Sequence, residues 1–227
     1  MSIKVVAFDA DDTLWVNEPY FRRTEEAFCV LLQDYLSQHN IERELLKTEL
    51  DNLPLYGYGV KGFVLSMVEA AIRITDGTCG IEVISKILDL GKAVLNEPIE
   101  LLEGVEDVLI SLQGKYRLVV ATKGDLLDQE RKLRKSGLAK YFHHIEIMSE
   151  KDEANYQKLI RHLDIQPHEL LMIGNSLKSD IMPVLNIGGH AIHVPYHITW
   201  VHEQIDHAIE HERFSVVTHI SQVLPVL

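Results

Sequence analysis

Three carboxylates follow the first apolar run of the chain. Val5–Phe8 is apolar, and Asp9, Asp11 and Asp12 come directly after it. Like charges this close raise one another's pKa and cost stability unless a cation or a reaction uses them. Along an extended segment, residues 9 and 11 lie on one side while Asp12 points elsewhere. The first two carboxylates can therefore face one ligand together.

The hydrophobic pattern predicts where the chain places these groups. Short apolar runs predict five strands, at residues 3–8, 116–122, 144–149, 169–174 and 191–195. Helical periodicity lies between them, at residues 126–137, 153–163 and 179–188. This alternation predicts an α/β fold with a doubly wound, Rossmann-like parallel sheet. Ligands of such sheets bind at the carboxyl ends of the strands.

The residues at these strand ends suit metal-assisted chemistry on phosphate. Thr122 and Lys123 end the second run, and Lys151 follows the third. A turn of small residues containing Asn175 and Asp180 follows the fourth. Mg²⁺ prefers hard oxygen ligands, and Thr and Lys side chains can hold phosphate oxygens.

A long helical segment interrupts the alternation after the first strand. Residues from about 20 to 95 contain only helical patterns. We therefore predict an α/β core made of residues 1–16 and 99–227, with a helical domain inserted at residues 17–98.

The order of these motifs resembles the haloacid dehalogenase-like hydrolase superfamily. D-x-D-x-T spans residues 9–13, a hydroxyl ends the second strand, a lysine precedes the next helix, and G-[DN]-S-x-x-x-D spans residues 174–180. The helical insertion resembles the cap domain of that family. The resemblance thus covers the whole chain and implies a capped hydrolase.

The resemblance also implies a role for each catalytic residue. Asp9 would be the nucleophile that forms an aspartyl-phosphate, and Asp11 would protonate the leaving group and then deprotonate water. Thr122 would bind a phosphoryl oxygen, and Lys151 would neutralise charge. Dehalogenases of the superfamily lack a carboxylate at the position of Asp11, so this residue indicates a phosphatase. Asp12 keeps only a loop or capping role.

The implied cofactor is Mg²⁺, and the motif that holds it departs from the family pattern. The ligands would be the Asp9 carboxylate, the Asp11 backbone carbonyl and residues of the fourth motif, Asn175 and Asp180. The family more often has Asp at position 175; Asn offers an oxygen without a charge. Asp180 would then supply the anionic ligand, directly or through water. We therefore expect a weakened Mg²⁺ dependence.

Other positions are candidates for substrate binding. Lys123 stands where the family commonly has Asn, and serves either as a second cation near the substrate or as a solvent-facing side chain. The glycine pattern of residues 57–62 follows a helix-like segment, so we do not expect a dinucleotide site there. It predicts a loop that begins a cap helix, with Tyr56, Tyr58 and Lys61 either selecting substrate or forming a structural turn.

The histidines do not predict a metal site. His207–His211 matches H-x-x-E-H, but it lies in a polar stretch, residues 200–214, for which we expect a solvated helix. His143, His144, His190 and His193 lack metal-ligand spacing, so we expect surface or loop positions.

The composition limits the class of partner. Among 227 residues, 22 Lys and Arg stand against 34 Asp and Glu, a formal charge of −12. Nucleic-acid and anionic-membrane surfaces are basic, so we expect neither partner. No apolar run is long enough for a membrane span. The first strand pattern begins almost at once, so we expect no signal peptide, and Cys29 and Cys79 are expected to be free thiols in the cytoplasm.

The sequence as a whole predicts a Mg²⁺-dependent phosphatase of small phosphorylated metabolites. Two alternatives use the same residues: a phosphomutase, and a catalytically weak protein that binds a phosphorylated ligand. A phospho-accepting receiver domain fits less well, because receivers lack the insertion and carry their phosphorylated Asp on a middle strand. The physiological substrate and the oligomeric state stay open.

Overall fold

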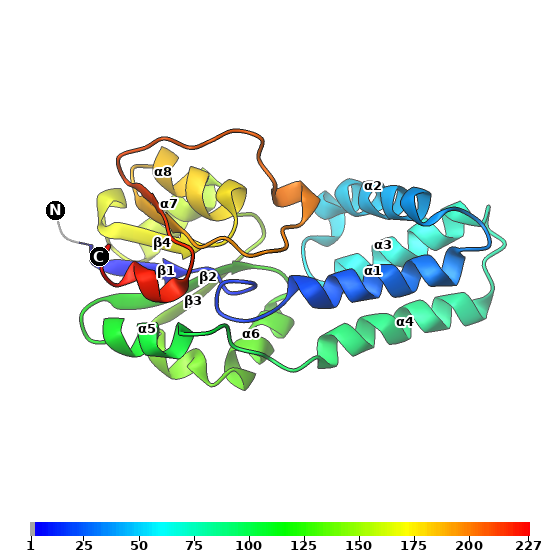
Figure 1. Cartoon of the computed structure of the whole chain (residues 1–227), viewed down its shortest axis with the longest axis horizontal. Helices are drawn as coiled ribbons and strands as arrows, with labels where there is room; N and C mark the ends of the chain where they lie inside the picture. Colours follow the sequence, from blue (N-terminus) through cyan, green and yellow to red (C-terminus); the bar gives the residue numbers. More distant parts are fainter. Residues whose placement is uncertain (1–2) are drawn as a thin grey trace. The chain divides into compact units, whose positions relative to one another are not determined.

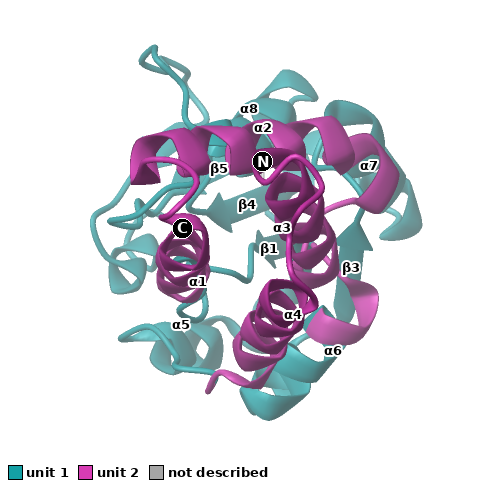
Figure 2. Ribbon diagram, turned by 90° about the vertical axis from the view of Figure 1, so that its right-hand side faces the viewer, with its two compact units in different colours: residues 1–18, 99–123, 129–227 teal, residues 19–98, 124–128 magenta. Residues whose placement is uncertain are grey.

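The computed structural model describes residues 3–227, which form two compact units (Figure 2). The α/β unit contains the described residues up to Glu18, with Ile99–Lys123 and Gln129–Leu227. The helical unit contains Pro19–Pro98 and Gly124–Asp128.

The α/β unit is built on a six-stranded parallel sheet (Figure 1). The strands are β1 (Val5–Phe8), β2 (Arg117–Lys123), β3 (His144–Met148), β4 (Leu170–Gly174), β5 (His190–His193) and β6 (Phe214–Val216). Their spatial order is β3-β2-β1-β4-β5-β6. The chain therefore proceeds from β1 toward one edge and then returns to the other side of β1. The predicted doubly wound sheet is confirmed, with β6 as a strand that the sequence did not predict.

Helices cover both faces of this sheet. They are α5 (Val105–Leu112), α6 (Leu126–Lys135), α7 (Glu153–His162) and α8 (Met182–Asn186), the last preceded by one wide π-type turn, Leu177–Ile181. Val6 and Phe8 pack in one cluster with α5, whereas Val5 and Ala7 pack in another with α7. Both sets of alternating side chains are thus buried, which explains why the strands read as continuous apolar runs.

The predicted helix over residues 200–214 is wrong. Only Val201–Glu203 forms a single 3₁₀ turn, and the rest of the connection from β5 to β6 is irregular. Short helices are marginal without tertiary packing, so individual contacts decide the path. Here Ile209 packs beside two buried residues, Ile181 of the wide turn and Leu185 of α8.

The helical unit contains four helices around its own core. They are α1 (Glu18–Leu32), α2 (Gln38–Tyr56), α3 (Val60–Ile74) and α4 (Ile81–Asn96). The core includes Phe28, Leu45, Met67 and Ile87. No helix in the described part of the chain is long and apolar enough to cross a membrane.

Both cysteines belong to the helical unit and are free thiols. Cys29 lies in the core, where burial raises its thiol pKa to about 11. Cys79 is partly buried beside the same core.

The two chain passages that flank the insertion pair with each other. Trp15 and Leu101 form an antiparallel bridge. The Val16 N–H donates to the Glu100 carbonyl at 2.9 Å, and the Leu102 N–H donates to the Leu14 carbonyl at 3.0 Å. The insertion thus leaves and re-enters the α/β unit at one point.

The packing of α3 against α4 requires a glycine. A Cβ at Gly91 would overlap the side chain of Val64. In an isolated helix alanine is more favourable than glycine by about 1 kcal/mol, but overpacking a core costs about 1–3 kcal/mol. We therefore expect Gly91→Ala to lower the free energy of unfolding, measured by urea titration. Ser85→Ala, exposed on the same helix, is the control. A Gly91→Ala protein as stable as wild type would contradict this packing.

Candidate active site

Parallel pairing brings the carboxyl ends of the central strands together. Phe8, at the end of β1, is in register with Val120 of β2 and Ile173 of β4. The strand order reverses direction at β1, and Asp9 follows it directly. In open α/β sheets this is the place where ligands bind.

A buried lysine lies between two carboxylates at this edge. The Lys151 ammonium donates to Asp9 Oδ1 and, at 2.6 Å, to Asp180 Oδ1. The second oxygen of Asp180 accepts the Ser176 N–H at 2.9 Å. Burial alone would lower the pKa of Lys151, but the charges of Asp180 and Asp9 outweigh it and hold that pKa above its ordinary value. The side chain is therefore a charged ammonium that fixes both carboxylates.

The environment of Asp9 is short of positive charge. Burial raises the pKa of Asp9 to about 7, with Lys151 lowering it and Asp180 adding to the increase. A single ammonium faces two carboxylates here. A cation beside Asp9 would therefore favour its ionised form.

The amide of Asn175 lies against Asp9, and its two terminal atoms can exchange places by rotation. With Oδ1 inward, it accepts the Thr13 hydroxyl at 3.2 Å. With Nδ2 inward, it donates to Asp9 Oδ2 at 3.1 Å and to the Asp11 carbonyl and Thr13 Oγ1, each at 3.2 Å. The position is thus surrounded by oxygens from three residues. A set of one carboxylate, one backbone carbonyl and one hydroxyl oxygen fits a hard divalent cation such as Mg²⁺.

The side chain of Asp11 is held by donors from two elements. Oδ1 accepts the indole N–H of Trp15 at 2.8 Å and the ammonium of Lys132 at 2.9 Å. Oδ2 accepts the amide of Gln129 at 2.7 Å. The sequence did not predict these three donors. The available signal was that Gln129 and Lys132 are three residues apart, and therefore on one face of a helix that follows a strand.

Asp12 caps the chain at the start of α1. Its carboxylate accepts the Asn17 N–H at 2.8 Å and the Glu18 N–H at 3.0 Å. Its φ of 60° is in the left-handed region, which Asp tolerates better than most residues. Burial raises the pKa of Asp12 to about 8, although the two backbone N–H donors act to lower it. The predicted capping role is confirmed.

Lys123 lies in a second polar network at the same strand ends. Its ammonium donates to Glu203 Oε1 at 2.5 Å and to Ser179 Oγ at 2.9 Å. The other oxygen of Glu203 accepts the hydroxyls of Ser176 and Ser179. The Lys123 side chain is only 12% exposed, so the solvent-facing alternative is wrong. Thr122, one residue earlier, is buried.

Glu203 lies at the edge of the site and was not predicted from the sequence. It belongs to the stretch predicted as a solvated helix, and its side chain is only 12% exposed. Burial would raise the pKa of Glu203, but Lys123 and the two serine hydroxyls lower it to about 2. No local pattern distinguishes Glu203 from the exposed glutamates that follow it.

The glycine pattern 57–62 forms the turn between α2 and α3, within the helical unit. Lys61 pairs with Asp125 at 3.1 Å, and a Cβ at Gly59 would lie 2.8 Å from the Asp125 nitrogen. Tyr56 donates to Glu69 at 2.7 Å. The turn does begin a helix, α3, as predicted. A role of Tyr56, Tyr58 and Lys61 in substrate selection stays a prediction.

Three of the four histidines differ from their expected surface or loop positions. His144, His190 and His193 are strand residues, and all three are partly buried. His193 Nε2 lies 2.9 Å from the Asn175 carbonyl, and burial lowers its pKa. His143 is exposed, as expected.

Comparisons with known proteins agree with this architecture. A model of the haloacid dehalogenase-like hydrolase family matches residues 3–188. Curated relatives include the N-acylneuraminate-9-phosphatases of Homo sapiens, 26% identical, and Mus musculus, 27% identical, each over 197 residues that cover 82% of this chain and 79% of the relative.

Solved structures give the same result. A haloacid dehalogenase-like family hydrolase from Xanthomonas campestris is 39% identical with a TM-score of 0.88, covering 97% of this chain and 88% of that one. The hydrolase YfnB from Bacillus subtilis, bound to magnesium, is 16% identical with a TM-score of 0.66, covering 100% and 99%. At that identity the second match supports the fold alone.

The ion pair of Glu203 with Lys123 makes the free energy of unfolding fall at acid pH. The pKa of Glu203 falls from 4.5 to about 2 on folding, so its contribution is complete above about 4.5 and is lost toward about 2. A shift of this size corresponds to about 3 kcal/mol. We therefore expect Glu203→Gln to lower the free energy of unfolding at about pH 6, and to lower it less at about pH 3.

Urea unfolding at both pH values measures this difference. Glu210→Gln, exposed in the same segment, is the matched control and should change the free energy of unfolding little. A loss for Glu203→Gln that stays constant with pH would show that the carboxylate is not stabilised by Lys123.

Proposed function

Because the chain belongs to the haloacid dehalogenase-like hydrolase family, we propose that it is a Mg²⁺-dependent phosphatase of small phosphorylated metabolites that works through an aspartyl-phosphate. The observation that carries this proposal is the position of Asp9, at the point where the strand order reverses and in contact with Lys151. Asp11, two residues later, supports phosphoryl transfer rather than carbon–halogen cleavage.

In the first step, an oxygen of Asp9 attacks phosphorus and the bond from phosphorus to the leaving oxygen breaks. Asp11 gives that oxygen its proton. Thr122 and Lys151 hold the phosphoryl oxygens, and Lys151 also fixes the orientation of Asp9. Burial of Asp9 keeps the nucleophile in one position.

In the second step, water attacks the phosphorus of the aspartyl-phosphate while Asp11 takes a proton from it. Phosphate leaves and the Asp9 carboxylate is regenerated. Trp15, Gln129 and Lys132 support this role because they orient the Asp11 carboxylate.

We propose that Asp9, the Asp11 carbonyl and Asn175 hold Mg²⁺, which when bound neutralises charge on the phosphoryl group. Asp180 was the other expected ligand, but its oxygens accept Lys151 and the Ser176 N–H. We therefore assign Asp180 to positioning Lys151.

The substrate is proposed from the relatives. Their name states that they act on N-acylneuraminate 9-phosphate, so phosphorylated sugar acids are the first class to test. The helical unit would serve as the cap that admits small molecules, with Tyr56, Tyr58 and Lys61 selecting among them. We propose a cytoplasmic location, with no nucleic-acid or membrane partner.

Replacing the nucleophile tests the central proposal. We expect Asp9→Asn to reduce phosphate release by about 10³-fold or more, because the amide cannot form the aspartyl-phosphate. The assay screens sugar phosphates, sugar-acid phosphates and nucleotides, with Mg²⁺ and with EDTA. Asp34→Asn, an exposed residue of the helical unit, is the control.

Three outcomes would contradict the proposal. Equal release by wild type and Asp9→Asn would exclude Asp9 as the nucleophile. An isomeric phosphate in place of free phosphate would indicate a phosphomutase. Binding of the phosphorylated compounds without turnover would indicate a ligand-binding protein.

A second test adds the missing charge at position 175. We expect Asn175→Asp to bind Mg²⁺ about tenfold more tightly, because a carboxylate replaces a neutral ligand. The same variant should be less stable than wild type in EDTA, because it adds a third carboxylate near Lys151 and removes a donor to Asp9.

Calorimetric Mg²⁺ titration and thermal unfolding measure the two effects without reference to activity. Asn96→Asp, exposed on α4, is the control. An unchanged Mg²⁺ affinity would place position 175 outside the metal's ligands.

A further inference from the structure

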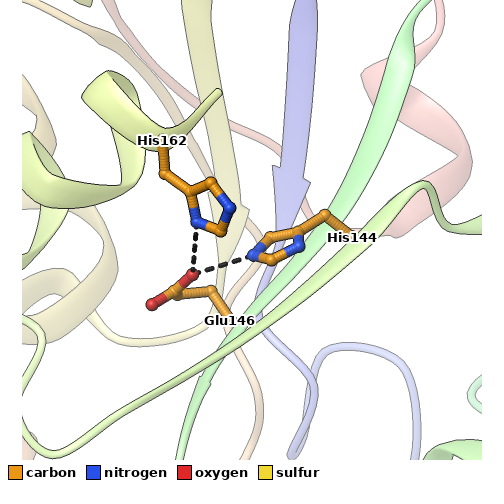
Figure 3. Close-up of side chains that lie close together, drawn as sticks. All are labelled: His144, Glu146 and His162. Carbon is orange, nitrogen blue, oxygen red and sulfur yellow. Dashed lines mark hydrogen bonds and ion pairs between the residues drawn. The ribbon is translucent and has the colours of Figure 1, made fainter. Parts of the chain in front are cut away.

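The edge strand of the sheet carries a group of potential metal ligands that the proposed reaction does not use. His144 and Glu146 are two residues apart on β3, and His162 is the last residue of α7 (Figure 3). Residues two apart on a strand point to the same face. Because α7 returns along the sheet after β3, its last turn meets the beginning of that strand.

The ligand atoms of these side chains converge on one position. Glu146 Oε2 lies 2.8 Å from His144 Nε2 and 3.7 Å from His162 Nδ1. The three ligand atoms lie within 4.8 Å of one another. The two imidazole rings pack edge to face, with their centroids 4.6 Å apart. Two nitrogens from two separate elements therefore face one carboxylate oxygen.

This spacing is close to what zinc requires. Zn²⁺ binds nitrogen and oxygen at about 2.0–2.2 Å, so neighbouring ligands of a tetrahedral site lie about 3.3–3.5 Å apart. The distances from Glu146 Oε2 to the two histidine nitrogens, 2.8 and 3.7 Å, fall on either side of that range. Small side-chain rotations would give a site with three protein ligands and a fourth position open to water.

The surroundings are also suitable for an ion from solution. The side chains of His144, Glu146 and His162 are 25%, 30% and 62% exposed, so the ligands are held by the fold yet reachable. The helix dipole places partial negative charge at the end of α7, which favours a cation beside His162.

We propose that His144 Nε2, Glu146 Oε2 and His162 Nδ1 form a Zn²⁺ site that is separate from the phosphoryl-transfer site. His144 begins β3, whereas Lys151 follows its end; the strand between them extends about 13 Å. Two imidazoles and a carboxylate select zinc and neighbouring transition metals over Mg²⁺. The bound ion joins the first residue of the edge strand to the last turn of α7.

Direct binding to the full-length protein tests the site. Zn²⁺ is titrated in competition with a chromophoric chelator, with saturating Mg²⁺ present to occupy oxygen-only sites. We expect one equivalent bound by wild type and at least about tenfold weaker binding by His144→Ala, Glu146→Gln and His162→Ala. His207→Ala and Cys79→Ser, at positions outside the cluster, should bind like wild type.

Histidine ¹⁵N spectra give a readout that is specific to the geometry. Zn²⁺ should shift His144 at Nε2 and His162 at Nδ1, while His207 stays unchanged. Zn²⁺ should also raise the unfolding temperature of wild type and leave that of His162→Ala unaffected. Far-UV circular dichroism confirms that each variant is folded.

Two results would overturn the proposal. One is the absence of a bound Zn²⁺ equivalent in wild type with Mg²⁺ present. The other is wild-type Zn²⁺ affinity in all three ligand variants, which would place the ion elsewhere. Neither result bears on Asp9 chemistry, so this test stands apart from the proposed phosphatase activity.

Discussion

The contact of Lys151 with Asp9 and Asp180 joins the ends of three strands. Asp9 follows β1, Lys151 follows β3, and Asp180 lies in the turn after β4. Buried charges are costly unless they are paired and hydrogen bonded, so the chain around them has little freedom. Gly174 shows this constraint, because a Cβ there would overlap the Asp180 carboxylate. The Lys151 ammonium thus fixes the Asp9 and Asp180 carboxylates, and the position of the Asp180 carboxylate in turn requires glycine at residue 174.

Around this centre, the side chains of Asp11 and Lys123 are oriented by partners from other elements. Asp11 is held by Trp15 from its own loop and by Gln129 and Lys132 from α6. Lys123 of β2 is held by Glu203 from the β5–β6 connection. These second partners lock the rotamers of both side chains, which the proposed phosphoryl transfer requires. The sheet sets the backbone positions of these residues, and the contacts with other elements set the positions of their terminal polar atoms.

The predictable part of the structure is the part encoded locally. Continuous apolar runs predicted five of the six strands, because a strand buried on both faces has no polar alternation. The strand-end positions of Asp9, Lys151 and Asn175 followed from those runs. Glu203 could not be predicted, because nothing near it specifies that an irregular segment folds back onto Lys123. The same holds for His144 and His162, whose proximity arises only when α7 returns along β3. The H-x-E spacing of His144 and Glu146 on a strand was the available signal.

The pairing of Trp15 with Leu101 has a consequence for how such a protein can diversify. The two passages that flank the inserted helices are hydrogen bonded side by side within the α/β unit, through Val16 with Glu100 and Leu14 with Leu102. An inserted segment is thus compatible with the α/β unit when its two ends lie close enough to form these hydrogen bonds. Loop-closure entropy grows slowly with length, so an insertion can be lengthened, shortened or exchanged at small thermodynamic cost. The inserted helical unit can therefore be exchanged by recombination while the sheet that carries Asp9 is inherited intact.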